Sequence, residues 1–231
     1  MNVSIFELIE GSRQAEGLTV IIDVFRAFSL ECYIYARGAR KIIPVGDLEQ
    51  AFALKRAQPD CVLIGERKGK KCEGCDFGNS PSQTEGFDFT GRTVIHTTSA
   101  GTQGVVNAVH ASEILVAGLV NARATADYIR KCAPDKVSLV AMGTNGVAST
   151  EEDVLCARYI RSLLLDEPLD IAALAPALRE TSGRKFFNPD TQEIFPEADF
   201  EMCIQYDRFP FALRIEKDAS GLFVTRRVDV Q

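Results

Sequence analysis

Short apolar runs alternate with helix-length segments along the first two thirds of the chain. Residues 19–22 form a β-prone run typical of a buried parallel strand, and residues 27–36 form a largely apolar, helix-length segment. Similar strand-like runs follow at residues 40–45, 61–64, 93–98, 113–117 and 136–141, with helix-like segments between most of them. Asp47 is expected to cap the helix-like segment that runs through Ala57. This alternation predicts an α/β fold with a mainly parallel sheet flanked by helices.

The order of these elements repeats once along the chain. Residues 18–90 and residues 92–165 each contain three strand-like runs, and the first runs share Thr-Val-Ile, at Thr19 and at Thr93. We therefore expect two related βαβαβ units within a single α/β domain that spans residues 1–231. An α/β chain without an internal duplication would show a similar repetition of strand-like and helix-like segments, and the sequence leaves that alternative open.

Residues 166–231 carry a weaker pattern. We expect a helix over residues 171–180, strands over residues 201–206, 211–215 and 222–226, and a hairpin turn over residues 218–221. This C-terminal part would complete the fold, either as structural filling or as a hairpin at the edge of the sheet.

Acidic residues cluster before the helix-like segment that ends near residue 165. Ser149 and Glu152 have the spacing of a capping box, and Glu151, Glu152 and Asp153 are favourable at a helix N-terminus. The same carboxylates could also hold a divalent cation. The two interpretations are compatible.

The composition is that of an ordinary globular protein with an acidic balance. Of the 231 residues 46% are hydrophobic and 25% are charged, and the formal net charge is −6. This charge argues against nucleic acid as a partner, and a small anionic substrate would need a local basic pocket. No apolar run reaches the ~18 residues of a membrane span, and the N-terminus lacks the basic start of a signal peptide. We expect a cytoplasmic protein without a membrane partner, either a monomer or a homo-oligomer.

Several motifs that would point to other chemistry are absent or incomplete. Cys72 and Cys75 form the only C-x-x-C pair, and nothing nearby completes a zinc site, which leaves two loop thiols or a labile disulfide. The chain has neither a Walker A motif nor a G-x-G-x-x-G motif, which disfavours kinase-like and dinucleotide-binding functions. We expect structural roles for His96 and His110.

Polar groups follow the ends of four predicted strands. They are Asp23 with Arg26, Glu66 with Arg67, residues 97–102, and Gly143 with the acids at 151–153. Because parallel strands place their carboxyl ends at one edge of a sheet, these groups are expected to converge. Carboxylates bind hard cations such as Mg²⁺ and arginines bind phosphate, so the set suits a phosphorylated substrate with a metal ion. A simple structural ion pair between Asp23 and Arg26 is the alternative.

These considerations define three groups of candidate residues. The catalytic candidates are Asp23, Arg26, Glu66, Arg67 and Asp153; the candidate Mg²⁺ ligands are Asp23, Glu152 and Asp153; the candidate substrate-binding residues are Asn79, Ser80, Thr98, Gly101 and Thr102. Lysines at positions 68, 70 and 71 would raise the local positive potential. Attack at phosphorus by a carboxylate and attack by water are both open.

Five blocks of sequence, taken together, resemble the 2-phosphosulfolactate phosphatase family. They lie at residues 22–29, 65–67, 77–81, 97–102 and 152–157. The resemblance implies an α/β fold, Mg²⁺ as cofactor, and hydrolysis of (2R)-O-phospho-3-sulfolactate to (2R)-3-sulfolactate and phosphate, a step of coenzyme M biosynthesis.

Two other functions are compatible with the same residues. A metal-dependent lyase or isomerase acting on a phosphorylated or sulfonated acid would use a similar pocket but release no inorganic phosphate. A non-catalytic anion-binding module is disfavoured by the acidic side chains, because an anion binder gains nothing from them.

Overall fold

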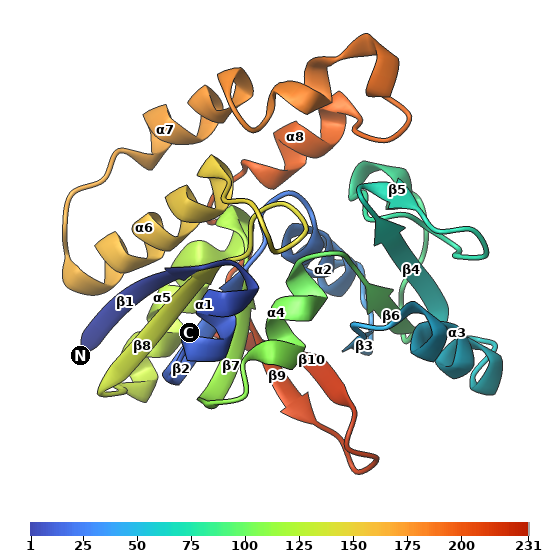
Figure 1. The fold of residues 1–231 in the computed structure, drawn as a ribbon, viewed down its shortest axis with the longest axis horizontal. Helices are drawn as coiled ribbons and strands as arrows, with labels where there is room; N and C mark the ends of the chain where they lie inside the picture. Colours follow the sequence, from blue (N-terminus) through green and yellow to red (C-terminus); the bar gives the residue numbers. More distant parts are fainter. Residues whose placement is uncertain (231) are drawn as a thin grey trace.

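A computed structural model describes residues 1–230, which form a ten-stranded sheet with helices packed around it (Figure 1). The strands are β1 (Asn2–Glu7), β2 (Gly17–Ile22), β3 (Lys41–Pro44), β4 (Val62–Arg67), β5 (Lys70–Lys71), β6 (Thr93–Thr97), β7 (Ala111–Ala117), β8 (Lys136–Ala141), β9 (Phe211–Lys217) and β10 (Phe223–Asp229). The helices are α1 (Leu8–Gln14), α2 (Ala27–Ala36), α3 (Leu48–Ala57), α4 (Gly101–Asn107), α5 (Ala122–Cys132), α6 (Glu151–Leu165), α7 (Ile171–Ala177) and α8 (Glu197–Cys203). Short 3₁₀ turns are η1 (Ser82–Thr84), η2 (Leu119–Asn121), η3 (Leu178–Glu180), η4 (Arg184–Phe187) and η5 (Pro189–Thr191). The predicted α/β class is confirmed.

The sheet consists of two parallel halves joined by an antiparallel hairpin. Its strand order is β1-β8-β2-β7-β9-β10-β3-β6-β4-β5. Strand β9 pairs antiparallel with β7, and β10 pairs antiparallel with β3. The expectation of an edge hairpin was therefore wrong, because β9 and β10 lie in the middle of the sheet. Consecutive buried residues in β9, from Phe211 to Leu213, reflect a strand that is covered on both faces.

The strands of the two predicted units are interleaved. Strand β2 of the first unit lies between β7 and β8 of the second, and β6 of the second lies between β3 and β4 of the first. Read outward from the hairpin, the order is β7, β2, β8 on one side and β3, β6, β4 on the other. Corresponding strands of the two units, β3 and β7, β2 and β6, and β4 and β8, therefore lie at the same distance from the hairpin on its two sides. The internal duplication itself stays a prediction.

The twist of the sheet decides where the strand ends lie. Three successive antiparallel pairings, β7 with β9, β9 with β10 and β10 with β3, make the two parallel halves run in opposite directions. In a flat sheet their carboxyl ends would lie at opposite edges. A twist of roughly 20–25° per strand pair, summed from β2 to β6, amounts to about 100–125° and turns the two sets of ends toward each other. Figure 1 shows β2 and β4 pointing toward the same upper region of the molecule.

Alternate residues of the strands face different layers of helices. In β2, Ile21 packs in the core cluster that contains Phe28 of α2, whereas Val20 and Ile22 pack in the cluster that contains residues of α5 and α6. This period of two is the geometry of a pleated strand buried on both faces. A third cluster places α3 against strands β3, β4 and β6.

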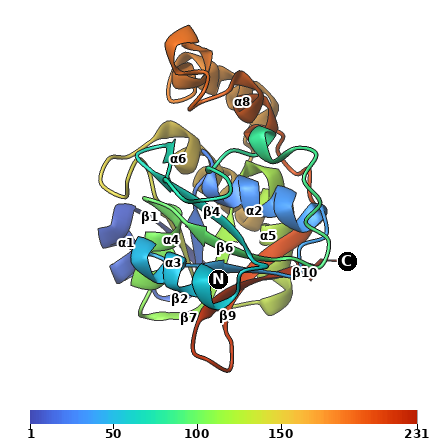
Figure 2. The same cartoon turned by 90° about the vertical axis from the view of Figure 1, so that its right-hand side faces the viewer.

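Residues 167–205, named here the cap segment, lie beyond the sheet along the top of Figure 1 and stand above the body of the molecule in Figure 2. The segment contains α7, η3, η4, η5 and α8. The strand predicted over residues 201–206 was wrong, because these residues include the end of α8. Pro196 at the N-cap, Glu197 and Asp199 in the first turn, and the buried Phe200 and Cys203 are helix signals that outweigh a short apolar run.

The start of α6 also differs from expectation. Thr150 occupies the N-cap position, and its side chain makes no capping hydrogen bond. The capping box of Ser149 and Glu152 was therefore wrong, because Glu152 is buried in the lining of a cavity instead of folding back on the chain. By contrast, the predicted cap of α3 is confirmed, since Asp47 accepts a hydrogen bond from the Gln50 amide at 2.7 Å.

Cys72 and Cys75 are free thiols in the turn that follows β5. Within residues 1–230, no helix combines the length and the apolar character that crossing a membrane requires.

Candidate active site

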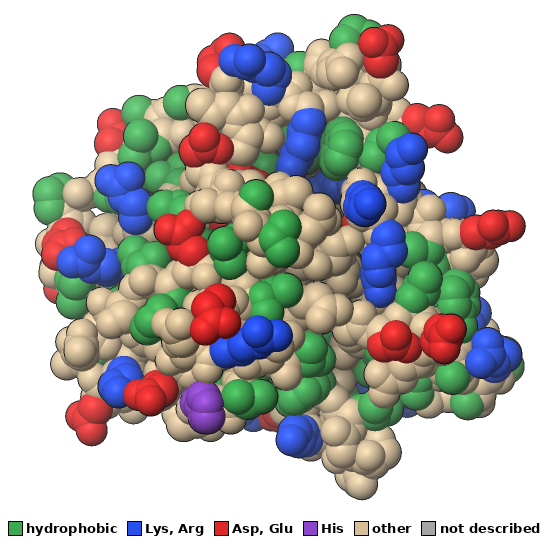
Figure 3. Space-filling view, viewed as in Figure 1, with side chains coloured by type: hydrophobic (Ala, Val, Ile, Leu, Met, Phe, Trp, Pro, Cys, Tyr) green, Lys and Arg blue, Asp and Glu red, His purple; other side chains and the backbone are tan. Residues whose placement is uncertain are grey.

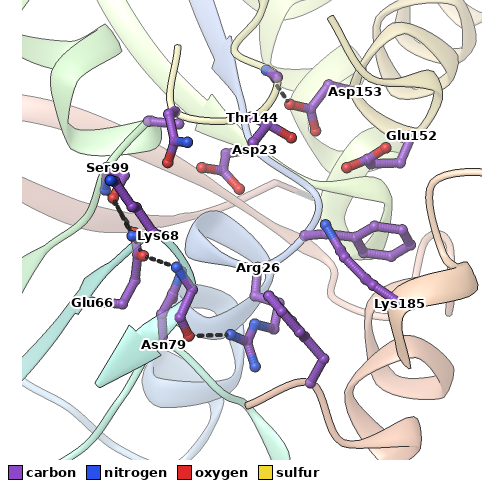
Figure 4. Close-up of a pocket in the computed structure, with 16 residues that line it drawn as sticks. Asp23, Arg26, Glu66, Lys68, Asn79, Ser99, Thr144, Glu152, Asp153 and Lys185 are labelled. Carbon is purple, nitrogen blue, oxygen red and sulfur yellow. Dashed lines mark hydrogen bonds between the residues drawn. The ribbon is translucent and has the colours of Figure 1, made fainter. Parts of the chain in front are cut away.

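A cavity of about 250 Å³ lies where β2, β4 and β8 end, beside the cap segment (Figure 4). Its charged lining residues are Asp23, Arg26, Glu66, Lys68, Glu152, Asp153 and Lys185. The remaining lining residues are Phe25, Gly69, Asn79, Ser99, Ala100, Gly143, Thr144, Asn145 and Phe195. Figure 3 shows Lys and Arg side chains gathered where the cap segment meets the region of β4 and β5. The molecule is acidic overall, yet it presents a basic surface here.

Asp23 links the end of β2 to the start of α2. Its Oδ1 atom accepts a hydrogen bond from the Ala27 amide at 3.1 Å, so the side chain supports the first helical turn while it faces the cavity. A Cβ atom on Gly101 would lie 3.0 Å from Asp23 Oδ2, so glycine permits this close approach of α4. Burial, together with the nearby Glu66 and Glu152 carboxylates, raises the pKa of Asp23 to about 6.

Asp153, in the first turn of α6, joins the ends of two neighbouring strands. Its Oδ1 atom accepts from the Val24 amide at 2.7 Å, and its Oδ2 atom accepts from the Gly143 amide at 2.8 Å. Gly143 has a φ of +62°, a left-handed conformation that glycine adopts without strain. Burial and the adjacent Glu152 and Asp23 carboxylates raise the pKa of Asp153 well above its usual range.

Glu66 fastens two loops on the opposite side of the cavity. Its two carboxylate oxygens accept hydrogen bonds from the Ser99 amide and the Gly69 amide, each at 2.6 Å. The neighbouring Arg67 donates instead to the Glu66 carbonyl at 2.6 Å and to Thr97 Oγ1 at 2.9 Å. Arg67 therefore ties β4 to β6 and is not among the residues that line the cavity.

Arg26 lies between the sheet and the cap segment. Its Nη1 atom donates to Asp199 Oδ2 at 2.6 Å and to the Ile194 carbonyl at 2.9 Å, and its Nη2 atom donates to the Gly69 carbonyl at 3.2 Å. The guanidinium carbon also lies 5.1 Å from the centre of the Phe195 ring. The ion pair that Arg26 forms is thus with Asp199, and the simple Asp23–Arg26 pair is not observed.

The acidic side of the cavity suits a hard divalent cation. Glu152 is 3% exposed, and its Oε2 atom has no hydrogen-bond partner within the described chain. The nearby Glu152 carboxylate contributes to the raised pKa values of Asp23 and Asp153, and a cation would relieve this repulsion. Among residues 1–230, no three His, Cys, Asp or Glu side chains form a ready-made metal cage. Mg²⁺ needs none, because it commonly uses one or two carboxylates and completes its shell with water and substrate phosphate.

The other predicted substrate-binding residues are distributed unevenly. Asn79 lines the cavity, whereas Ser80 donates a hydrogen bond to Asp199 at 2.9 Å in the wall behind Arg26. Thr98 and Thr102 bond to each other across the first turn of α4, with each amide donating to the other hydroxyl at 3.1 Å. Ser80, Thr98, Gly101 and Thr102 are not among the residues that line the cavity. Direct contact with substrate stays a prediction for them.

Several residues of the site were missed or undervalued in the sequence. Lys185 and Asp199 come from the cap segment, where the pattern of the sequence is weak, although the basic-aromatic run Arg-Lys-Phe-Phe over residues 184–187 was a usable signal. His96 is fully buried, with Nδ1 2.9 Å from Glu31 Oε1 and Nε2 3.4 Å from Asn79 Oδ1. It supports the cavity-lining Asn79 from within the core.

Comparisons with known proteins identify the family of the chain. A profile of the family described as 2-phosphosulpholactate phosphatase matches residues 3–217. A probable 2-phosphosulfolactate phosphatase of Bacillus subtilis (strain 168) is 30% identical over 224 residues, covering 94% of this chain and 95% of the relative. Proteins with the same name from Caldicellulosiruptor saccharolyticus and Clostridium acetobutylicum are 34% and 36% identical, covering 83% and 81% of this chain and 86% and 85% of their own lengths. The chain therefore belongs to the 2-phosphosulpholactate phosphatase family, a family of phosphoric monoester hydrolases.

Proposed function

We propose that the protein is a Mg²⁺-dependent phosphatase that hydrolyses (2R)-O-phospho-3-sulfolactate or a closely similar small phosphorylated acid. The observation that carries this proposal is the meeting of four carboxylates and three cationic side chains in one small cavity. Its volume of about 250 Å³ is below the roughly 300–1,000 Å³ of pockets for drug-sized ligands, which favours a small metabolite. The name of the relatives supplies the particular substrate.

Cationic and amide groups would bind the phosphoryl oxygens. Arg26 has five N–H donors, and three of them are engaged in the bonds to Asp199, Ile194 and Gly69, which leaves two for a ligand. Asn79 and Lys68 line the same cavity and would add further donors. Charge-assisted hydrogen bonds of this kind stabilise the negative charge of a phosphoryl group during transfer.

The carboxylates would serve the metal and the geometry of the site. Asp23 and Glu152 each present an oxygen that takes no hydrogen bond from residues 1–230, so these two are our candidate ligands. Asp153 would act mainly by holding the ends of β2 and β8 together. When bound, Mg²⁺ would withdraw charge from the phosphoryl oxygens as a Lewis acid. In the net reaction water adds to phosphorus, the ester P–O bond breaks, and the released oxygen takes up a proton to become the hydroxyl of sulfolactate.

Phosphate release tests this proposal. Purified protein with Mg²⁺ should liberate inorganic phosphate and sulfolactate in equal amounts from phosphosulfolactate, and EDTA should abolish the activity. Asp23→Asn should lower kcat/KM at least about 100-fold, whereas Glu49→Gln, which changes an exposed carboxylate on α3, should have no effect. Absence of phosphate release from any small phosphorylated acid would overturn the proposal, and loss of substrate without phosphate would favour a lyase or isomerase.

A binding measurement examines the metal independently of turnover. Mg²⁺ should raise the melting temperature of the protein, because a ligand that binds only the folded state stabilises it. The shift should shrink in Asp23→Asn and in Glu152→Gln and stay unchanged in Glu49→Gln. An equal shift in all four proteins would contradict the proposed ligands.

A further inference from the structure

Lys185 enters the cavity from the cap segment, and no carboxylate of residues 1–230 pairs with it. Its Nζ atom lies 5.6 Å from the ring centre of Phe25, and 5.5 Å from the ring centres of both Phe186 and Phe195. Within residues 1–230 it takes part in no ion pair or hydrogen bond that we observe. A half-buried ammonium held by aromatic faces keeps its full charge available to a ligand.

The other cations of the lining have different surroundings. Arg26 is paired with Asp199, so its charge is already balanced by the protein. Lys68 is exposed in the turn between β4 and β5 and is also without an ion pair among the described residues. Figure 4 shows Lys68 and Lys185 on opposite sides of Asp23. The two unpaired ammonium groups therefore reach the cavity from two sides and from two distant parts of the chain.

This arrangement of Lys185 destabilises the folded protein. Partial burial of an ammonium group without a counter-charge is unfavourable, and three aromatic rings compensate for it only in part. Residues that break a local rule of stability in this way are concentrated at functional sites. A ligand that brings its own negative charge to Lys185 would supply the missing partner.

We propose that Lys185 determines specificity by binding a second anionic group, a sulfonate or a carboxylate, of a substrate whose phosphoryl group is held on the side of Asp23, Asn79 and Lys68. The inference rests on the proposed phosphatase function and assigns recognition of the acid group of the substrate to a residue of the cap segment. The preferred substrates are phosphomonoesters of small acids, and phosphorylated neutral alcohols are poor substrates. The cap segment thereby takes part in recognition as well as in covering the site.

A series of three phosphoesters tests the proposal. Phosphosulfolactate carries phosphate, carboxylate and sulfonate; 2-phospholactate lacks the sulfonate; isopropyl phosphate lacks both additional anions. Lys185→Met keeps a stem of similar length against the rings and removes the charge, whereas Lys185→Arg keeps the charge. Arg184→Met removes a neighbouring charge that is exposed and outside the cavity lining, which makes it the matched control.

We expect Lys185→Met to lower kcat/KM for phosphosulfolactate by 10- to 100-fold more than for isopropyl phosphate, mainly through KM. Lys185→Arg should recover part of the loss, and Arg184→Met should behave like the wild type. If the loss is already absent with 2-phospholactate, Lys185 binds the sulfonate. If the loss is absent only with isopropyl phosphate, Lys185 binds the carboxylate. An equal loss on all three substrates would assign Lys185 to the phosphoryl group or to folding and would overturn the proposal.

Equilibrium binding separates failure of this inference from failure of the phosphatase function. If the wild type releases no phosphate, calorimetric titration with 3-sulfolactate still reports on Lys185. Binding that weakens at least tenfold in Lys185→Met and not in Arg184→Met supports the anion site. Equal binding by both variants, or no binding by the wild type, overturns it.

Discussion

Asp199 of the cap segment accepts a hydrogen bond from the guanidinium of Arg26 at 2.6 Å, and both side chains are buried. Asp199 Oδ1 also accepts from Ser80 and from the amide and hydroxyl of Ser82. One carboxylate thus connects α8, the start of α2 and the loop that carries Asn79. The cap segment is fastened to the sheet at the point where substrate is expected to bind.

Asp199→Asn should destabilise the protein by about 3–5 kcal/mol, because it leaves the buried guanidinium of Arg26 without a counter-charge. The free energy of unfolding in urea measures this effect. In the double variant Arg26→Met/Asp199→Asn much of the stability should return, since no uncompensated charge remains and the amide oxygen at position 199 can still accept from Ser80 and Ser82, while phosphatase activity stays low. A single variant that loses less than about 1 kcal/mol would show that the pair is not a principal attachment of the cap.

The raised pKa of Asp23 should make the metal-free protein less stable as the pH increases. The native pKa of about 6 lies above the ordinary value of 3.8, so the folded state binds the proton more readily than the unfolded state. The associated stabilisation is present below about pH 4 and is lost as the pH rises through 6. At pH 8 Asp23→Asn should therefore be more stable than the wild type by up to about 3 kcal/mol, although it is inactive.

Urea unfolding between pH 4 and pH 8 in the presence of EDTA checks the sign of this effect. The wild type should show a steeper loss of stability with rising pH than Asp23→Asn, and Glu49→Gln should follow the wild type. Parallel profiles for all three proteins would contradict the assignment to Asp23.

The adjacent acids Glu152 and Asp153 should respond differently to the same chemical change. Asp153→Asn should cost about 1–3 kcal/mol, because an amide cannot accept hydrogen bonds at both ends from the Val24 and Gly143 amides. Glu152→Gln should leave stability nearly unchanged, since Oε2 of Glu152 has no hydrogen-bond partner in residues 1–230. Thermal melts and phosphate release, compared side by side, should show that Glu152→Gln loses activity alone and Asp153→Asn loses both.

Asn79 should be oriented by the buried His96. Asn79 Oδ1 lies 3.4 Å from His96 Nε2, and this contact turns the NH₂ group of Asn79 toward the cavity. Asn79→Asp keeps an acceptor for His96 but replaces the donor to phosphate by a negative charge. We expect kcat/KM to fall about 100-fold with a melting temperature close to that of the wild type. Turnover near the wild-type rate would show that Asn79 does not contact the phosphoryl group.

The helices and strands of the first two thirds were predictable because each buries a regular pattern of apolar residues. The periodicity located α2 and β8 at their observed bounds, and the identity of Asp47 was sufficient to predict the cap of α3. The local sequence pattern wrongly predicted a capping box at Glu152, because this side chain is buried in the lining of the cavity. It also failed in α8, where a short apolar run resembled a strand.

The sequence by itself determined the α/β class, the acids and bases that follow the strands, and the family resemblance, because these depend on residue type and on short-range periodicity. Only the tertiary structure decided that a C-terminal hairpin separates two parallel halves of opposite direction, and that the twist of the sheet brings their carboxyl ends to one cavity. It also decided that Asp199 pairs with Arg26 and that Lys185 lies against aromatic rings without an ion-pair partner among residues 1–230. The Arg26–Asp199 pair joins residues 173 positions apart, and no local pattern specifies such a pairing.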